Sequence, residues 1–166
     1  WRHPGANPKA LTDLELYVDA ARIAENAKFD AVFLADTLVG PENSQLVASG
    51  LLEPITLLTA LALKTERIGL IGTASTTYSH PYTLARQFAT LDHISKGRAG
   101  WNIVTSWAPK AGENYGLAEN VDHADRYRIA QEFVEAVAAL RRSFPANSIV
   151  DDAASGQFLA IGKVRP

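Results

Sequence analysis

The chain has 166 residues and a mass of 17.9 kDa, about one domain at the usual size of roughly 150 residues per domain. Its 47% hydrophobic and 20% charged residues are typical of a globular protein, and no run approaches the roughly 18 apolar residues that cross a bilayer. Sixteen basic and eighteen acidic side chains give a net charge of −2, too even for a surface that binds nucleic acid or acidic lipid by charge.

Two residue types are missing from the sequence. Because there are zero cysteines, disulfides, thiolate metal sites and a cysteine nucleophile are excluded. There is no methionine either, not even at position 1, so we expect the chain to be a piece of a longer polypeptide. No signal-peptide pattern is present, which predicts a cytoplasmic protein.

The hydrophobic pattern alternates between helical periods and short apolar runs, which predicts repeated βα units. A capping box at residues 12–15 opens the first helix, Pro54 and Pro81 suit the first turns of the next two, and Asp122 is a plausible N-cap of the last. Residues 151–166 have no clear period and are expected to be loop. The expected helices cover about residues 12–28, 54–65, 81–97 and 123–142, and the expected strands residues 30–35, 68–71 and 99–104.

Three apolar strands separated by single helices predict a parallel α/β sheet with right-handed crossovers, either doubly wound or part of a (β/α)₈ barrel. In both architectures ligands bind beyond the carboxyl ends of the strands. Polar residues stand there after all three strands. Each alone could cap a helix or close a turn, but together they predict a binding rim. They are Asp36, Thr73, Ser75, Asn102, Thr105 and Ser106.

His123, Arg126 and Tyr127 are spaced to share one face at the start of the last helix. That position suits a phosphate or the edge of a flavin ring, although a solvated helix start would have the same pattern. The four histidines lack the spacing of metal ligands, so no metal site is expected. Trp1, Trp101 and Trp107 could line a cofactor or pack in the core, and core packing is expected for Trp101.

Three well-known nucleotide and hydrolase motifs are absent. The sequence has no G-x-G-x-x-G, no Walker motif and no G-x-S-x-G. A dinucleotide-binding Rossmann domain therefore lacks its main signature, and an α/β-hydrolase nucleophile has no candidate.

Several segments, in order along nearly the whole chain, resemble the flavin-dependent monooxygenases of the bacterial luciferase-like superfamily. The similarity is greatest to the group that contains nitrilotriacetate monooxygenase, dibenzothiophene-sulfone monooxygenase and pristinamycin synthase. The run over residues 91–106 is long enough to be specific. The other matching segments are residues 1–4, 28–36, 65–70, 73–78 and 123–127.

The resemblance implies a (β/α)₈ TIM barrel of the luciferase-like type, of which residues 1–166 form the N-terminal part, with strands two to four of eight. It also implies reduced FMN supplied by a separate NAD(P)H:flavin reductase, O₂, a small organic substrate and a homo-oligomer. The protein then positions the cofactor and excludes water. Family flavin contacts that match positions of this sequence are Asp36, Thr73, His123 and Tyr127, and Asn102 is expected to face the flavin as well.

The sequence also departs from the family pattern. Relatives have a strand before residues 1–4 and further βα units after the last helix, including a flavin contact that is absent here, and the loop over residues 37–53 is short. The isolated chain is therefore expected to be inactive. A non-catalytic fragment or subunit that needs a partner, and a deazaflavin-dependent oxidoreductase that transfers hydride, remain alternatives. A metal hydrolase is disfavoured by the histidine spacing.

Overall fold

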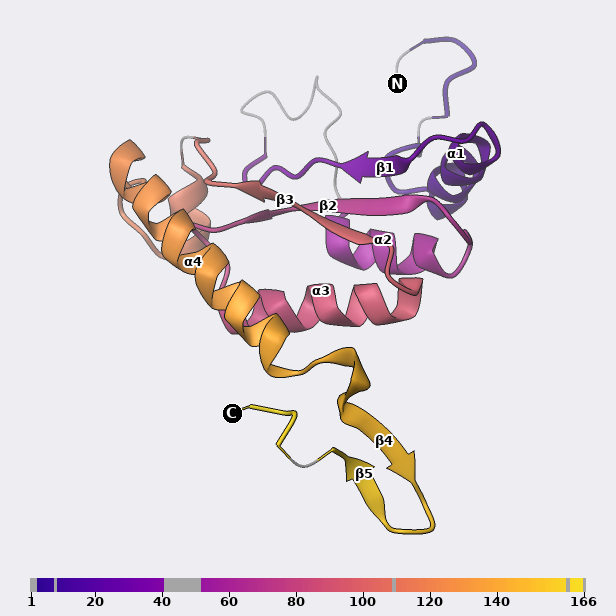
Figure 1. Cartoon of the computed structure of the whole chain (residues 1–166). Helices are drawn as coiled ribbons and strands as arrows, with labels where there is room; N and C mark the ends of the chain where they lie inside the picture. Colours follow the sequence, from indigo (N-terminus) through magenta and orange to yellow (C-terminus); the bar gives the residue numbers. More distant parts are fainter. Residues whose placement is uncertain (1–2, 8, 41–51, 109, 161, 166) are drawn as a thin grey trace.

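A parallel sheet of three strands lies at the centre of the computed structural model, which describes residues 3–7, 9–40, 52–108, 110–160 and 162–165. The strands are β1 (Ala31–Leu34), β2 (Gly69–Ser75) and β3 (Ala99–Val104), in the order β1-β2-β3 (Figure 1). Ala31 pairs with Gly69, and Leu70 pairs with Ala99. The parallel α/β sheet predicted from the sequence is thus confirmed.

In the part of the chain that the structure describes, four α-helices alternate with these strands. They are α1 (Leu14–Asn26), α2 (Pro54–Ala62), α3 (Pro81–Ser95) and α4 (His123–Ser143). Figure 1 shows α2 and α3 side by side under one face of the sheet, with α4 crossing obliquely beyond β3. The loop expected over residues 37–50 falls largely on residues 41–51, which lie outside the described residues, as does Trp1.

The helix starts show which capping predictions were correct. Asp122 is the N-cap of α4 and accepts from the amide of Ala124 at 2.9 Å, and proline occupies the first turn of α2 and of α3, all as predicted. The predicted capping box at the first helix is wrong by one residue. Asp13 is the N-cap there and accepts from the amide of Glu15, whereas the hydroxyl of Thr12 donates to the carbonyl of Lys9.

Strand β2 is longer than its apolar run. It was expected over residues 68–71, but residues 72–75 continue the pairing with β3 as far as Ser75 opposite Val104. Small hydroxyl side chains are compatible with a central strand because the ladder is made by the backbone. This extension carries Thr73 and Ser75 to the end of the sheet.

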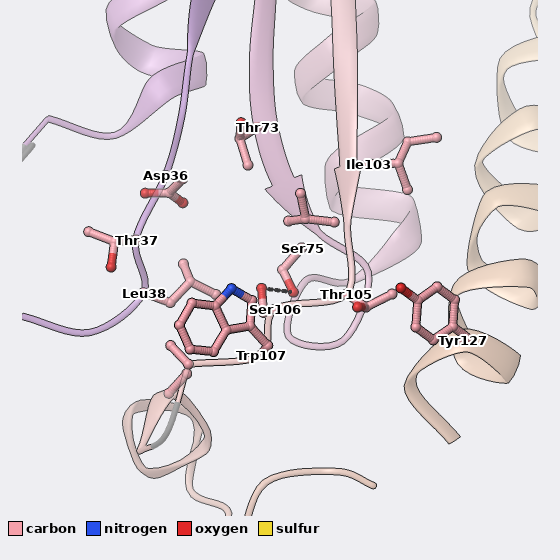
Figure 2. Close-up of a pocket in the computed structure, with 13 residues that line it drawn as sticks. Asp36, Thr37, Leu38, Thr73, Ser75, Ile103, Thr105, Ser106, Trp107 and Tyr127 are labelled. Carbon is pink, nitrogen blue, oxygen red and sulfur yellow. Dashed lines mark hydrogen bonds between the residues drawn. The ribbon is translucent and has the colours of Figure 1, made fainter. Parts of the chain in front are cut away.

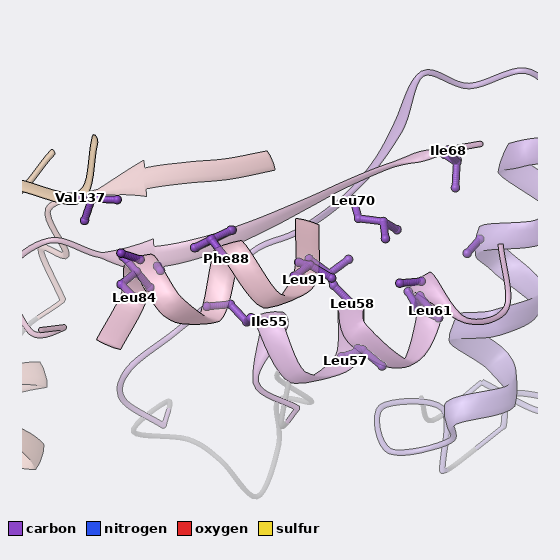
Figure 3. Packing of buried hydrophobic residues seen from close by; sticks show 14 of the residues in the cluster. Ile55, Leu57, Leu58, Leu61, Ile68, Leu70, Leu84, Phe88, Leu91 and Val137 are labelled. Carbon is purple, nitrogen blue, oxygen red and sulfur yellow. The ribbon is translucent and has the colours of Figure 1, made fainter. Parts of the chain in front are cut away.

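The core lies between the sheet and the two helices beneath it. Leu58, Leu70 and Leu91 are fully buried there (Figure 3). A Cβ at Gly72 would lie 2.9 Å from Cδ1 of Leu58, so glycine is what allows β2 and α2 to approach so closely. Because side chains alternate along a strand, Thr73 and its odd-numbered neighbours face away from these helices.

Trp101 is partly buried and packs against the core, in line with the expected core packing. Its indole Nε1 donates to the carbonyl of Ala74 at 3.1 Å, and its ring lies 5.9 Å from Phe88 and 6.0 Å from Phe133 between centroids. Trp101 thereby joins β3 to α3 and α4.

Two charged side chains hold the amino ends of the strands together. The guanidinium of Arg98 donates five hydrogen bonds, four of them to the carbonyls of Ala62, Thr65, Ile68 and Ser95. Oε1 of Glu25 accepts from three consecutive amides, those of residues 66–68. In barrel sheets, residues at the amino ends of the strands commonly contribute to stability, whereas ligands bind at the carboxyl ends.

The segment after α4 contains regular structure that was not expected. Residues 151–166 were predicted to be loop, but β4 (Ile149–Asp152) and β5 (Gln157–Leu159) form an antiparallel hairpin that extends away from the sheet. The run is too short for a hydrophobic period, and its turn contains Gly156 with φ of +69°. A 3₁₀ turn, η2 (Ala146–Ser148), precedes the hairpin. Within the described part of the chain, no helix has the length and hydropathy required to span a lipid bilayer.

Candidate functional site

A pocket of about 560 Å³ opens at the carboxyl ends of the three strands (Figure 2). Its lining comes from the loop after β1, from β2, from the end of β3 with its following loop, from the 3₁₀ helix η1 (Ala111–Tyr115) and from α4. In that order, the lining residues are 36–38, Thr73 and Ser75, 103–108, Ala111 and Tyr127. The pocket therefore lies where ligands bind in parallel α/β proteins.

Three of the five residues expected to contact the flavin line this pocket, and the other two each contact a lining residue. Asp36, Thr73 and Tyr127 line it directly. Asn102 and His123 are not lining residues, but each contacts one: the side-chain amide of Asn102 donates to Oγ1 of Thr73 at 2.9 Å, and the ring of the exposed His123 lies 5.0 Å from that of Tyr127. The pocket thus brings together one predicted residue from the loop after β1, one from β2 and one from α4.

The hydroxyl of Thr73 is held in a defined orientation. Thr73 is 4% exposed, and its oxygen accepts the hydrogen bond from Asn102. Its own proton has no acceptor among the described residues. Since buried hydroxyls normally satisfy their donor, the O–H of Thr73 is available to a ligand in the pocket.

The ends of β2 and β3 are fastened together at the rim. The hydroxyl of Ser106 donates to Oγ of Ser75 at 2.9 Å, as the dashed line in Figure 2 shows. The hydroxyl of Thr77 donates to the carbonyl of Thr105 at 2.6 Å. Ser106 has φ of +49°, a left-handed conformation that is unusual for serine and turns the chain sharply beyond the strand. Ser75 and Ser106 are both among the rim residues predicted from the sequence, and both line the pocket.

Asp36 contributes the one charged side chain among the described residues of the lining. Burial raises the pKa of its carboxyl above the usual value, the nearby Glu53 adds to this rise, and a hydrogen bond from the amide of Thr37 opposes it. The pKa of the Tyr115 phenol is raised as well. Burial is the main cause, and the charges of Asp36 and Tyr78 add to it. A partly desolvated carboxyl in a pocket is a typical ligand-binding group.

The loop after β3 forms a wall that the sequence pattern did not reveal. The side-chain amide of Asn114 in η1 donates to the carbonyl of Leu38 at 2.8 Å, which links the loops after the two outer strands. Tyr115 stacks on Tyr78 from the loop after β2, with ring centroids 4.8 Å apart. The phenol of Tyr78 donates to Oδ1 of Asn120. The residues of η1 therefore connect all three strand-to-helix loops.

Arg126 does not line the pocket, although it shares a helix with Tyr127. Its Nη1 donates to the carbonyl of Val121 at 3.1 Å, and its Nε is buried without a hydrogen-bond partner in the described structure. Across the residues that the structure describes, no three histidine, aspartate or glutamate side chains gather as a metal site would require.

Comparison with known proteins identifies the family. A sequence description of the luciferase-like monooxygenases matches residues 1–161. The chain belongs to the luciferase-like monooxygenase family. Its sheet is thus of the TIM-barrel type, one of the two architectures that the sequence pattern allowed.

Individual relatives agree with this assignment. The chain is 45% identical to nitrilotriacetate monooxygenase component A of Aminobacter aminovorans, over 95% of this chain and 38% of the relative. It is 39% identical to dibenzothiophene-sulfone monooxygenase of Rhodococcus erythropolis, over 99% of this chain and 38% of the relative. The chain therefore spans about two fifths of the length of these relatives.

Solved structures show the same backbone arrangement. The EDTA monooxygenase from Chelativorans sp. BNC1 superposes with a TM-score of 0.84 at 38% identity, over 97% of this chain and 40% of that one. A riboflavin lyase, solved with modified FMN and the substrate riboflavin, superposes with a TM-score of 0.89 at 34% identity, over 99% of this chain and 39% of that one.

Proposed function

We propose that the protein is a flavin-dependent monooxygenase of the two-component kind. It takes FMN in reduced form from a separate NAD(P)H:flavin reductase and uses O₂ to oxygenate a small organic substrate. The observation that carries the proposal is the convergence of Asp36, Thr73 and Tyr127 on one pocket at the strand ends of a luciferase-like chain. The monooxygenase names of its relatives, at 34–45% identity, support the reaction class.

The pocket suits a flavin in size and in lining. Its volume of about 560 Å³ is in the range typical of cofactor sites. Apolar side chains such as Leu38 and Trp107 offer contact to a flat ring system, while Asp36 and Thr73 offer an acceptor and a donor for its polar edge. The donor proton of Thr73, which no described residue accepts, is the feature that best fits such a ligand.

Each residue then has a defined task. Bound FMN supplies the redox chemistry with O₂, so the protein's task is to bind, orient and shield. Thr73, oriented by Asn102, donates to an acceptor of the ring, and the carboxyl of Asp36 accepts from a donor. His123 is the first residue of α4 and Tyr127 lies one turn further along, near the helix end where the dipole favours an anionic part of the ligand. The linked loops restrict access of water to the pocket.

The same proposal includes the place of this chain in the whole protein. Residues 1–166 form the N-terminal part of a single (β/α)₈ barrel domain, and β1, β2 and β3 are its second to fourth strands. The coverage of about two fifths of each relative supports this arrangement. We also propose a cytoplasmic homo-oligomer.

Anaerobic titration of the full-length protein with reduced FMN tests the proposal. We expect saturable binding that weakens by about tenfold or more in both Asp36→Ala and Thr73→Val, because each loses a buried hydrogen bond to the ligand. Asp19→Asn, a change at an exposed aspartate of α1, is the matched control and should bind like the wild type.

The other outcomes are equally informative. Preferential binding of a reduced deazaflavin would favour hydride transfer and contradict the monooxygenase proposal. A full-length protein that binds neither cofactor would be a non-catalytic member of the family. A large loss of stability in Asp36→Ala without a specific effect on FMN would assign Asp36 to loop structure.

A further inference from the structure

We propose that Asn120 is a positioning residue of the cofactor pocket, which holds the loop after β3, residues 105–122, against the segment that carries Asp36. Asn120 does not line the pocket, so it acts through other residues. This inference rests on the proposed function and names a residue on which flavin binding depends without direct contact.

The side chain of Asn120 joins its own loop to the loop after β2. Its Oδ1 accepts from the amide of Gly112 at 3.1 Å and from the phenol of Tyr78 at 3.0 Å. Its Nδ2 donates to the carbonyl of Ala108 at 2.9 Å. Because an amide side chain carries an acceptor and a donor together, this one residue both closes its loop and fastens it to a neighbour.

The backbone of this loop depends on such fastening. Ser106, Lys110 and Gly116 have φ of +49°, +65° and +78°, so two residues other than glycine are in the left-handed region. Such conformations persist only where surrounding contacts hold them. Gly112 is buried, and a Cβ there would lie 3.2 Å from Oδ1 of Asn120, which shows how tightly the loop closes on this side chain.

The loop reaches the segment of Asp36 through η1. The side-chain amide of Asn114 donates at 2.8 Å to the carbonyl of Leu38, two residues after Asp36. The next residue, Tyr115, stacks on Tyr78 with ring centroids 4.8 Å apart. Tyr115 also lies close enough to Asp36 for the carboxylate charge to contribute to the raised pKa of the phenol. Loosening the loop therefore admits water to Asp36.

The electrostatics of Asp36 give this role a specific signature. Burial raises the pKa of its carboxyl, Glu53 adds to the rise, and the amide of Thr37 opposes it. Tyr115, the third titratable group nearby, is uncharged at acid pH. In the proposed site the carboxylate accepts from FMN, so binding weakens as the pH falls through the pKa of Asp36. Losing the anchor at Asn120 hydrates Asp36, lowers this pKa and moves the acid limit of FMN binding to lower pH.

Three variants of the full-length protein test the proposal: Asn120→Ala, Tyr78→Phe and their combination. Tyr78→Phe keeps the stacked ring but loses its bond to Asn120. Anaerobic titration with reduced FMN at several pH values measures the Kd and its acid limit. Ionisation of FMN itself is common to all variants, so the difference between them reports Asp36.

We expect Asn120→Ala to raise the Kd at pH 7 about three- to tenfold and to shift the acid limit to lower pH. Tyr78→Phe should have the same effects more weakly, and the double variant should match Asn120→Ala. Asn26→Ala, at an exposed asparagine at the end of α1, is the matched control and should bind like the wild type.

Hydrogen–deuterium exchange of the flavin-free proteins follows the loop itself. We expect peptides from residues 105–122 and 36–40 to exchange about tenfold or more faster in Asn120→Ala than in Asn26→Ala or the wild type, because the amide of Gly112 loses its acceptor and the loop its anchor. The urea midpoint of unfolding should change little, since Asn120 lies outside the core cluster.

Several results would overturn the assignment. An acid limit that stays in place in Asn120→Ala, or unchanged exchange of residues 36–40, would show that Asn120 does not act on Asp36. A lower urea midpoint without a shift of the acid limit would make Asn120 a merely structural residue. A wild-type protein that binds no reduced FMN contradicts the proposed function, and the exchange measurements still decide whether Asn120 holds the loop.

Discussion

The side-chain amide of Asn102 donates to the hydroxyl of Thr73 at 2.9 Å, and the two residues are direct partners in the register of β3 and β2. Side chains of paired residues stand on the same face of a sheet, here the face away from α2 and α3. Asn102 therefore acts on the pocket through Thr73.

This relationship predicts how the two residues combine. Asn102→Ala should weaken binding of reduced FMN by about tenfold, because the hydroxyl of Thr73 loses the donor that orients it. Adding Asn102→Ala to Thr73→Val should cost little more than Thr73→Val alone, since the amide then has no hydroxyl to orient. Titrations of the two single variants and the double variant measure the coupling. Additive losses would mean that Asn102 contacts the ligand independently.

His123 provides a second test of the site. His123→Ala should raise the Kd for reduced FMN by about three- to tenfold, because it removes the ring beside Tyr127 at the first turn of α4. Thermal unfolding should change little, since His123 is exposed and the cap of α4 is Asp122. His93→Ala, at an exposed histidine in the last turn of α3, is the matched control. Unchanged affinity together with unchanged melting would remove His123 from the site.

The parts of the fold that local chemistry determines could be predicted from the sequence. Proline at the first turn of α2 and α3, Asp122 before α4 and the apolar run of β3 each have a short-range cause, and those predictions were confirmed. The end of β2 was missed because residues 72–75 are held by pairing with β3, which depends on distant residues. The hairpin of β4 and β5 was missed because its strands are too short to show a period.

The candidate site likewise has residues that could be predicted from the sequence and residues that could not. Asp36, Thr73 and Ser75 follow from the rule that polar residues at the carboxyl ends of parallel strands meet at one edge. Leu38 and the bond that Asn114 makes to its carbonyl could not be inferred, because that bond joins residues 76 positions apart through an irregular loop. The sequence does contain one indication for Leu38: it is an apolar residue two positions after Asp36, just beyond the end of β1.

Arg98 should matter for stability and leave ligand binding unchanged. Its guanidinium fills carbonyl acceptors at the ends of α2 and α3 and before β2, at the opposite end of the sheet from the pocket. Arg98→Lys keeps the charge but lacks the planar fork, so we expect a loss of about 2–4 kcal/mol in the free energy of unfolding. Urea unfolding measures the loss, and FMN titration of the folded variant should give the wild-type Kd. A weaker affinity in the folded state would contradict a purely structural role.

Glu25 contributes to the dependence of stability on pH in the acid range. Hydrogen bonds from the amides of Arg67 and Ile68, and more weakly of Glu66, lower the pKa of Glu25 from the ordinary 4.5 to about 2. Because the folded pKa lies below the unfolded one, the carboxylate stabilises the fold fully above pH 4.5, and this contribution is lost as the pH falls toward about 2. Glu25→Gln should therefore be less stable than the wild type at pH 7, and the difference should shrink between pH 4.5 and 2. Urea unfolding at several pH values in this range measures the difference in the free energy of unfolding, and Glu15→Gln, at an exposed glutamate, is the control. A difference that stays constant with pH would show that the carboxylate of Glu25 does not stabilise the segment of residues 66–68.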